Sequence, residues 1–256
     1  MRWLICWLLE LIVRTVRIVQ SGFCPGWNEP QVPPDTAVDD GKTPDEIAGL
    51  YEWWKADAQS FSDNDPATPV VTSVGGGNNL SEATNPPTFK TGIVNGLPVL
   101  RFDGTNDVLK TTNATPNVAQ PITAFIVVNF SSVAGVRVIY DSTIGNRILS
   151  YLDTNLKIFA GAIYGSSASL SASTWYVIVS KFNTVNSFSR VNGTQSASGD
   201  AGAQSQDYNI SVGASPDNSN PFAGDIAEIG FYSAALTDQE ILDLELGFRT
   251  KYAITF

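Results

Sequence analysis

The sequence predicts a mostly β protein, an antiparallel sandwich of two sheets that ends in one C-terminal helix. From Leu50 onward, short segments with apolar side chains at every second position alternate with clusters of Gly, Asn and Ser. A helix start signal follows the last of these segments. A hydrophobic N-terminal helix and a Pro-rich linker precede the sandwich, so we expect three regions: residues 1–20, 21–47 and 48–256.

The first twenty residues predict a helix that is apolar around most of its circumference. Glu10, Arg14 and Arg17 fall at i, i+4 and i+7 and form one narrow polar stripe. Such a helix cannot remain in water alone. Three interpretations therefore stay open: burial against protein, which we favour, contact with a membrane, or a signal sequence. The residues expected to anchor it are Trp3, Leu4, Trp7, Leu8, Leu11 and Ile12.

Residues 21–47 are rich in Pro, Asp and Gly and show no periodicity, which is typical of a linker. At its end, Thr43–Glu46 has the pattern of a helix N-terminus, with a Thr cap, Pro at the first position and Glu at the third. We expect a short helical turn through residues 47–50.

From Leu50 the chain changes character and continues in short strands at regular spacing. Asn95–Gly96 and Asn192–Gly193 predict tight turns between neighbouring strands. Asp103 predicts a turn in which its carboxylate accepts hydrogen bonds from nearby backbone. The segment 122–130 is apolar on both faces, as expected for a strand between a core and a covered surface. Further strands are predicted over residues 122–130, 136–140, 147–152, 156–164, 175–182, 187–193 and 208–214.

The chain closes with a strand at 225–232 and an amphipathic helix. Thr237 and Glu240 have the spacing of a capping box, which satisfies two backbone donors at a helix start. We expect the helix to pack on the sandwich through the apolar face formed by Ile241, Leu244 and Phe248.

Three segments carry a resemblance to a known family: RFDGTNDVL (101–109), WYVIVSKFNTVNSFSRVNGTQ (175–195) and FAGDIAEIGFYSAALTDQEILDLELGFRTKYAI (222–254). In this order and spacing they resemble the laminin-G-like/concanavalin A-like jelly-roll modules of bacterial and phage surface proteins. The resemblance covers about residues 48–254 and implies a jelly-roll sandwich. It implies less about function, because this fold carries lectins, hydrolases and structural modules alike.

The composition excludes several kinds of chemistry. The chain has no histidine, which removes Ser–His–Asp and Cys–His catalysis and histidine-ligated zinc. Two cysteines, Cys6 and Cys24, are too few for a disulfide scaffold or a thiolate metal cage. The net charge of −10 argues against a nucleic-acid partner, whose phosphates are bound by cations. We therefore expect no nucleic-acid partner and no cofactor, with calcium as the one alternative that stays open.

Hydrolases of the resembled fold place their acids on a strand that reads E-x-D-x-x-E. When this pattern is aligned with AGDIAEI (223–229), Asp225 takes the position of the middle acid and Glu228 that of the last acid. Ala223 takes the position of the nucleophile. A retaining glycosidase needs two carboxylates. We therefore expect a protein without enzymatic activity, in which Glu228 pairs with a neighbouring side chain.

Glycan recognition needs aromatic surfaces beside polar groups that bind hydroxyls. The aromatic candidates are Trp53, Trp54, Tyr140 and Tyr232, with Tyr151 and Tyr164 also available. Calcium takes carboxylate oxygens from loops. Its candidate ligands are Asp63 and Asp65 in one loop and Asp103 and Asp107 in another, although for Asp103 and Asp107 we favour a structural role in the turn.

The favoured hypothesis is a non-enzymatic decoration protein of a virion or similar surface assembly. Its N-terminal helix would bind other structural proteins and its jelly roll would face outward at the virion surface. By analogy with threefold phage fibres we expect a homo-oligomer, a trimer. The alternative is a carbohydrate-binding module, secreted or tethered to a membrane at the cell surface, and a glycoside hydrolase ranks third. The first two are compatible if the displayed domain binds glycans.

Overall fold

The computed structural model describes residues 40–111, 117–142, 147–166, 168–206 and 209–256. The predicted helix over residues 1–20, its anchor residues and residues 21–39 of the predicted linker lie outside the described residues. The described strands form two antiparallel sheets whose facing sides share one core, which confirms the predicted sandwich. No helix within the described ranges combines the length and the apolar character needed to cross a membrane.

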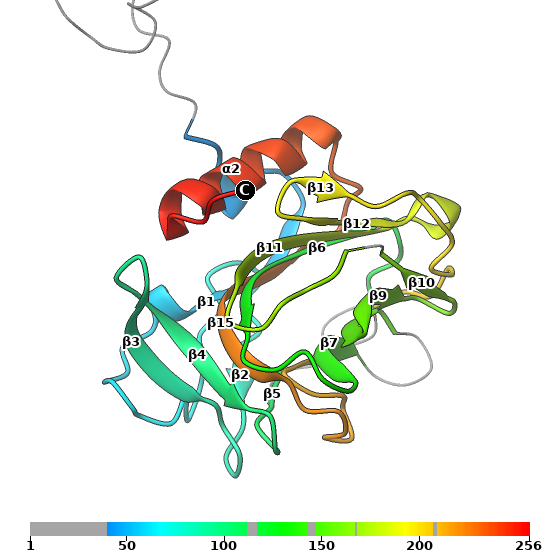
Figure 1. The fold of residues 1–256 in the computed structure, drawn as a ribbon. Coiled ribbons are helices and arrows are strands. Elements are labelled where there is room, and N and C mark those ends of the chain that lie inside the picture. Colours follow the sequence, from blue (N-terminus) through cyan, green and yellow to red (C-terminus); the bar gives the residue numbers. More distant parts are fainter. Residues whose placement is uncertain (1–39, 112–116, 143–146, 167, 207–208) are drawn as a thin grey trace, which may run out of the picture. The chain divides into compact units, whose positions relative to one another are not determined.

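The first sheet has eight strands in the order β13-β12-β11-β6-β15-β4-β3, with β1 also paired to β15 (Figure 1). Strands β6, β11 and β15 form its centre, and the predicted bounds of β6 and β11 are confirmed. The strands are β1 (Leu50–Lys55), β3 (Thr88–Val94), β4 (Leu97–Asp103), β6 (Ile122–Phe130), β11 (Trp175–Phe182), β12 (Phe188–Val191), β13 (Thr194–Gln195) and β15 (Ala223–Tyr232).

The second sheet has seven strands in the order β10-β9-β8-β7-β14-β5-β2. The single strand predicted over residues 156–164 is a hairpin of two strands, because the chain turns at Gly161, whose φ is +110°. The strands are β2 (Leu80–Ser81), β5 (Leu109–Thr111), β7 (Arg137–Ser142), β8 (Leu149–Asp153), β9 (Asn155–Phe159), β10 (Ile163–Gly165) and β14 (Ile210–Val212). Short 3-10 helices occur at η1 (Pro44–Glu46), η2 (Ala56–Ala58) and η3 (Thr184–Asn186).

The centre of the first sheet is buried on both faces, as the apolar pattern of residues 122–130 predicts. Along β6, Ile126 and Val128 point toward the second sheet. Phe125 and Val127 point the other way, into a second core beneath α2 (Asp238–Tyr252). Figure 1 shows α2 lying across the outside of the first sheet. The sandwich therefore has a third layer over part of its outer face.

Helix α2 begins and packs as predicted. Thr237 Oγ1 accepts a hydrogen bond from the Glu240 backbone N–H at 3.2 Å, and the Glu240 carboxylate accepts one from the Thr237 backbone N–H at 2.8 Å. The predicted apolar face is buried against the sheet and comprises Ile241, Leu244 and Phe248.

Residues 41–47, which we call the N-terminal strap, pack on α2 and β15. The Lys42 backbone N–H donates to the Asp243 carbonyl at 2.9 Å, and Lys42 Nζ lies 2.7 Å from the Asp243 carboxylate. The Tyr232 hydroxyl donates to the Pro44 carbonyl at 2.9 Å. The helical turn expected over residues 47–50 is wrong: it lies earlier, at Pro44–Glu46, and Leu50 already begins β1 to pair with Tyr232.

Candidate functional site

A row of five side chains crosses the outer face of the first sheet. The register pairs Trp175 of β11 with Asn129 of β6, and Asn129 with Asp225 of β15. It continues from Asp225 to Arg101 of β4, and from Arg101 to Thr88 of β3. Directly paired residues share a face and lie about 5 Å apart. We call these five residues the outer row.

The alternation of the strands sets the place of the outer row relative to α2. Its chain neighbours Phe102, Phe130 and Ile226 point between the sheets. Val99 lies two residues before Arg101 in β4, and Val127 lies two residues before Asn129 in β6. Both valines belong to the core beneath α2. The outer row therefore lies on the same face of the first sheet as α2, next to the part of that face that α2 covers.

Four members of the outer row, Thr88, Arg101, Asn129 and Asp225, line a cavity of ≈ 560 Å³, which is within the size range of small-molecule sites, and Trp175 is not among the lining residues. Gly224 forms part of its wall with a φ of +151°, and a side-chain carbon there would lie 2.0 Å from the carbonyl oxygen of Asn129. The absence of a side chain at this position therefore keeps β15 and β6 in register. The cavity is lined by Thr88, Arg101, Phe102, Asp103, Asp107, Asn129, Ser131, Ser173, Gly224 and Asp225.

Arg101 and Asp225 form a two-pronged ion pair in the middle of the row. Arg101 Nε donates to Asp225 Oδ1 at 2.7 Å, and Nη2 donates to Oδ2 at 2.9 Å. This pairing raises the pKa of Arg101. The Asp225 carboxylate is nearly buried, whereas the Arg101 side chain is 44% exposed. The ion pair therefore fixes the guanidinium while leaving its remaining N–H groups open to the cavity.

Asp103 and Asp107 border the cavity on the turn that follows β4. Asp103 Oδ1 accepts hydrogen bonds from the Thr105 and Asn106 backbone N–H groups, which confirms the predicted turn. Asp107 Oδ2 accepts from the Asp103 backbone N–H at 2.8 Å. Burial, with a contribution from the nearby Asp103 charge, raises the pKa of Asp107 to about 6.

Asn129, which lies between Trp175 and Asp225 in the row, contributes unused hydrogen-bonding capacity. Its side chain is half-buried, and within the described part of the chain its carboxamide has no hydrogen-bond partner. A carboxamide offers donors and an acceptor together. Beside it, the half-buried Trp175 ring packs on the edge of the core beneath α2. An amide next to an indole suits a ligand with both hydroxyl groups and an apolar face.

The four aromatic residues predicted to bind glycans lie in the interior, and this corrects the prediction. Trp53 and Trp54 are 5% and 1% exposed, and Tyr140 and Tyr232 are 2% and 0% exposed. Their rings pack on other aromatic and aliphatic side chains, for example Tyr140 edge-on to Phe231 with 5.1 Å between ring centres. They therefore present no ring surface to a ligand. Tyr151 and Tyr164 are half-buried on the second sheet.

The carboxylates predicted to bind calcium are separated into two loops and are engaged by protein donors. Asp63 Oδ1 accepts from the Thr91 backbone N–H at 2.8 Å, which lowers the pKa of Asp63. Asp65 Oδ2 accepts from the Ser62 backbone N–H at 2.8 Å. Asp103 and Asp107 hold the turn described above. Among the described residues, no group of three or more His, Cys, Asp or Glu side chains could hold a metal ion.

A β-bulge in β15 separates the two acids of the hydrolase-like strand. The register of β15 against β6 shifts between Ile226 and Glu228. As a result both Ala227 and Glu228 turn toward the core beneath α2, whereas Asp225 remains in the outer row. Glu228 accepts hydrogen bonds from Trp53 Nε1 at 2.7 Å and Tyr252 Oη at 2.6 Å, and it also contacts Lys251 Nζ. The predicted pairing of Glu228 is therefore present.

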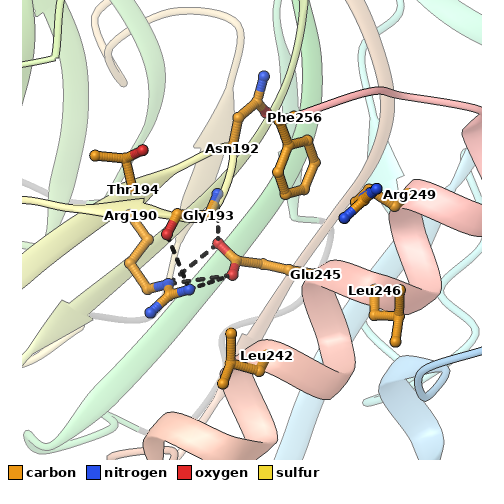
Figure 2. Close-up of a pocket in the computed structure, with 9 residues that line it drawn as sticks. All are labelled: Arg190, Asn192, Gly193, Thr194, Leu242, Glu245, Leu246, Arg249 and Phe256. Carbon is orange, nitrogen blue, oxygen red and sulfur yellow. Dashed lines mark hydrogen bonds and ion pairs between the residues drawn. The ribbon is translucent and has the colours of Figure 1, made fainter. Parts of the chain in front are cut away.

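A second cavity, of ≈ 460 Å³, lies between α2 and the β12–β13 hairpin (Figure 2). Arg190 Nη2 donates to Glu245 Oε2 at 2.7 Å, and both side chains are almost fully buried. The Gly193 backbone N–H also donates to Glu245, and Arg249 lies over the Phe256 ring at 5.1 Å. Because Arg190 and Glu245 engage each other and Arg249 covers the Phe256 ring, these contacts join α2 to the hairpin, and the cavity is a poorer candidate for ligand binding.

Sequence reasoning missed most of the outer row. The hydrolase pattern indicates only Asp225 among the five residues. The other four are brought beside it by the register between strands, which is a property of strand pairing. One local signal was available: Asn129 and Arg101 are polar residues at outward positions of otherwise apolar strands.

Fold and site together define a lectin-like β-sandwich with a polar cavity beside the helix that covers its outer face. A family model described as the concanavalin A-like lectin/glucanases superfamily matches residues 103–242. The chain belongs to this superfamily, and the predicted resemblance is confirmed. No curated protein matches the chain.

Solved structures resemble the fold at low sequence identity. Domain 4 of an extracellular arabinanase from Geobacillus stearothermophilus, solved in complex with arabinotriose, has a TM-score of 0.59 at 14% identity, covering 77% of this chain and 98% of that one. A Trypanosoma rangeli sialidase in complex with sialic acid has a TM-score of 0.58 at 12% identity, covering 82% of this chain. This chain spans 34% of the length of the sialidase. At these identities the likeness is one of fold.

Proposed function

We propose that residues 40–256 form a non-catalytic carbohydrate-binding module and that the outer-row cavity is its ligand site. One observation carries the proposal: the unpartnered Asn129 carboxamide lies between the half-buried Trp175 ring and the Arg101–Asp225 pair on one face. Sugars bring hydroxyl groups, which pair with amides and charged groups, and C–H faces, which pack on indoles. The arabinotriose bound to the arabinanase domain of similar fold supports this choice by analogy.

The absence of catalysis is part of the proposal. Ala223 stands where the hydrolase pattern requires a nucleophile, and Asp225 is engaged by two N–H groups of Arg101. Glu228 is enclosed beneath α2 by Trp53 and Tyr252. These three features leave the pattern without two acids that can reach one glycosidic bond.

Binding of the full-length chain to a broad glycan array tests the proposal. We expect reproducible binding that falls at least about fivefold in Asn129→Ala and in Trp175→Ala, since each removes a contact worth about 1–3 kcal/mol. Asn155→Ala is the matched control, because Asn155 is half-buried on β9 of the other sheet. An array without binding, or binding that the two outer-row variants leave unchanged, would overturn the assignment.

We also propose that this module is displayed on a surface assembly, with a virion as the favoured case and a cell surface or extracellular role as the alternative. The support is the sequence of residues 1–20, whose anchor residues Trp3, Leu4, Trp7, Leu8, Leu11 and Ile12 require burial. The partners would be other structural proteins or two further copies in a trimer. Deletion of residues 1–39, which preserves the strap, should give a monomer in light scattering that no longer joins the assembly. A truncated chain that is still trimeric would contradict the anchor.

A further inference from the structure

The charges around the outer-row cavity are unequally paired. Its lining includes three carboxylates, Asp103, Asp107 and Asp225, but one guanidinium, Arg101. The Arg101 charge is offset by Asp225, which accepts two of its hydrogen bonds. The cavity therefore retains the negative charge of the other two carboxylates.

Asp103 and Asp107 have no cationic partner among the residues that the structure describes. Their partners are the uncharged backbone N–H groups of Thr105, Asn106 and Asp103. Arg137 approaches the same turn, but it donates to the carbonyl oxygens of Gly104 and Pro221 rather than to a carboxylate. The chain as a whole has a net charge of −10, so its overall charge does not offset this local field.

We propose that the outer-row cavity excludes acidic sugars, such as uronic and sialic acids, and that Asp103 and Asp107 are the residues that determine this specificity. The inference rests on the proposed glycan-binding function and adds its ligand class: saccharides that are uncharged or carry an amine. Neutral hydroxyl groups lose nothing beside a carboxylate, to which they donate. A ligand carboxylate is repelled by both aspartates, and this repulsion strengthens as the ligand displaces water.

The experiment compares matched ligands on the full-length chain. An array would carry pairs of ligands, each with a neutral saccharide and an acidic counterpart that contains the same backbone. Examples are lactose with sialyllactose and methyl-esterified with de-esterified galacturonan. We expect the neutral member of each bound pair to bind at least about tenfold more tightly. Raising the salt concentration from 0.05 to 0.5 M should shrink this ratio, because it shortens the Debye length about threefold.

The double variant Asp103→Asn/Asp107→Asn should reduce the preference to less than about threefold, since it removes both charges. Carboxamide oxygens can still accept the backbone hydrogen bonds of the turn. The control Asp200→Asn/Asp217→Asn changes the net charge equally at two other turn aspartates that accept from backbone N–H groups but do not line the cavity. It should keep the full preference.

The outcomes separate the two proposals. Equal or tighter binding of the acidic member overturns the exclusion of acidic sugars but leaves glycan binding intact. A preference that survives 0.5 M salt overturns the electrostatic cause, and this measurement needs no variant to fold. No binding to either member of any pair overturns glycan binding, and the inferred ligand class falls with it.

Discussion

Replacement of Glu228 by alanine should destabilise the fold rather than alter ligand binding. Glu228 is 1% exposed and accepts hydrogen bonds from Trp53 and Tyr252, with Lys251 as its cationic partner. Burial by itself would lower the pKa of Lys251, but Glu228 and Asp57 more than offset this and raise it. The carboxylate therefore joins β15, β1 and the last turn of α2.

The size of the loss follows from the groups left behind. Lys251 retains Asp57, whose carboxylate lies 2.9 Å from its Nζ, so the ammonium stays paired. The Trp53 and Tyr252 donors lose their acceptor in a buried site, at about 1–3 kcal/mol each. Together with the broken ion pair, we expect a loss of about 3–5 kcal/mol in the free energy of unfolding. For a domain of this size that is about 6–20 °C in Tm.

Thermal and urea unfolding of the purified chain measure this loss. Glu228→Gln preserves an acceptor and the side-chain shape and should show a smaller decrease. Asp238→Ala removes an exposed carboxylate from the first turn of α2 and should change stability by less than about 1 kcal/mol. If Glu228→Ala left Tm unchanged while abolishing glycan binding, Glu228 would belong to the ligand site and our description of it would be wrong.

Three further changes test other parts of the structure. Glu245→Ala leaves the buried Arg190 guanidinium without its carboxylate partner and should lower the free energy of unfolding, measured by urea titration, by about 3–5 kcal/mol. An unchanged urea midpoint would mean that Arg190 reaches water. Tyr140→Phe removes a buried hydroxyl that has no hydrogen-bond partner among the described residues, so stability should stay the same or rise by about 1 kcal/mol, and a clear decrease would reveal a missing partner. Asp107 has a pKa of about 6 in the native state and about 3.9 in the unfolded state, so the native state binds this proton more tightly. The resulting contribution to stability is present below about pH 4 and is lost as pH rises through about 6. Asp107→Asn should therefore raise Tm relative to the native chain at pH 7 but not at pH 4, and an equal shift at both values would contradict the assignment.

The sandwich was predictable because its central strands are locally unambiguous. In β6 and β11 apolar side chains occupy most positions on both faces, and the bounds of the two strands agree with the prediction. The Thr237–Glu240 capping box likewise fixes the start of α2 through local hydrogen bonds. Such signals depend on neighbouring residues alone, which is why one sequence contains them.

The site was not predictable to the same degree, because it depends on contacts between distant segments. Trp53 and Tyr232 are aromatic residues beside polar ones, as in a glycan site, but α2 and the strap bury them. The outer row requires the pairing of Trp175 with Asn129 and of Asn129 with Asp225. These residues lie on three strands that are far apart in the chain. A pattern within one strand cannot show which residues of other strands lie beside it.

The N-terminal strap determines how a mechanical load would enter the domain. Gly41 and Gly247 lie so close that a side-chain carbon at Gly41 would be 2.1 Å from the Gly247 backbone nitrogen, and Lys42 is joined to Asp243 by backbone and side chain. Tension applied ahead of Asp40 is therefore transmitted first to the middle of α2 and to Tyr232 of the central strand β15, before it reaches β1. Tethered on its N-terminal side, the domain would receive a pulling force through α2 and the Tyr232 end of β15, whereas the cavity residues Gly224 and Asp225 lie near the other end of that strand.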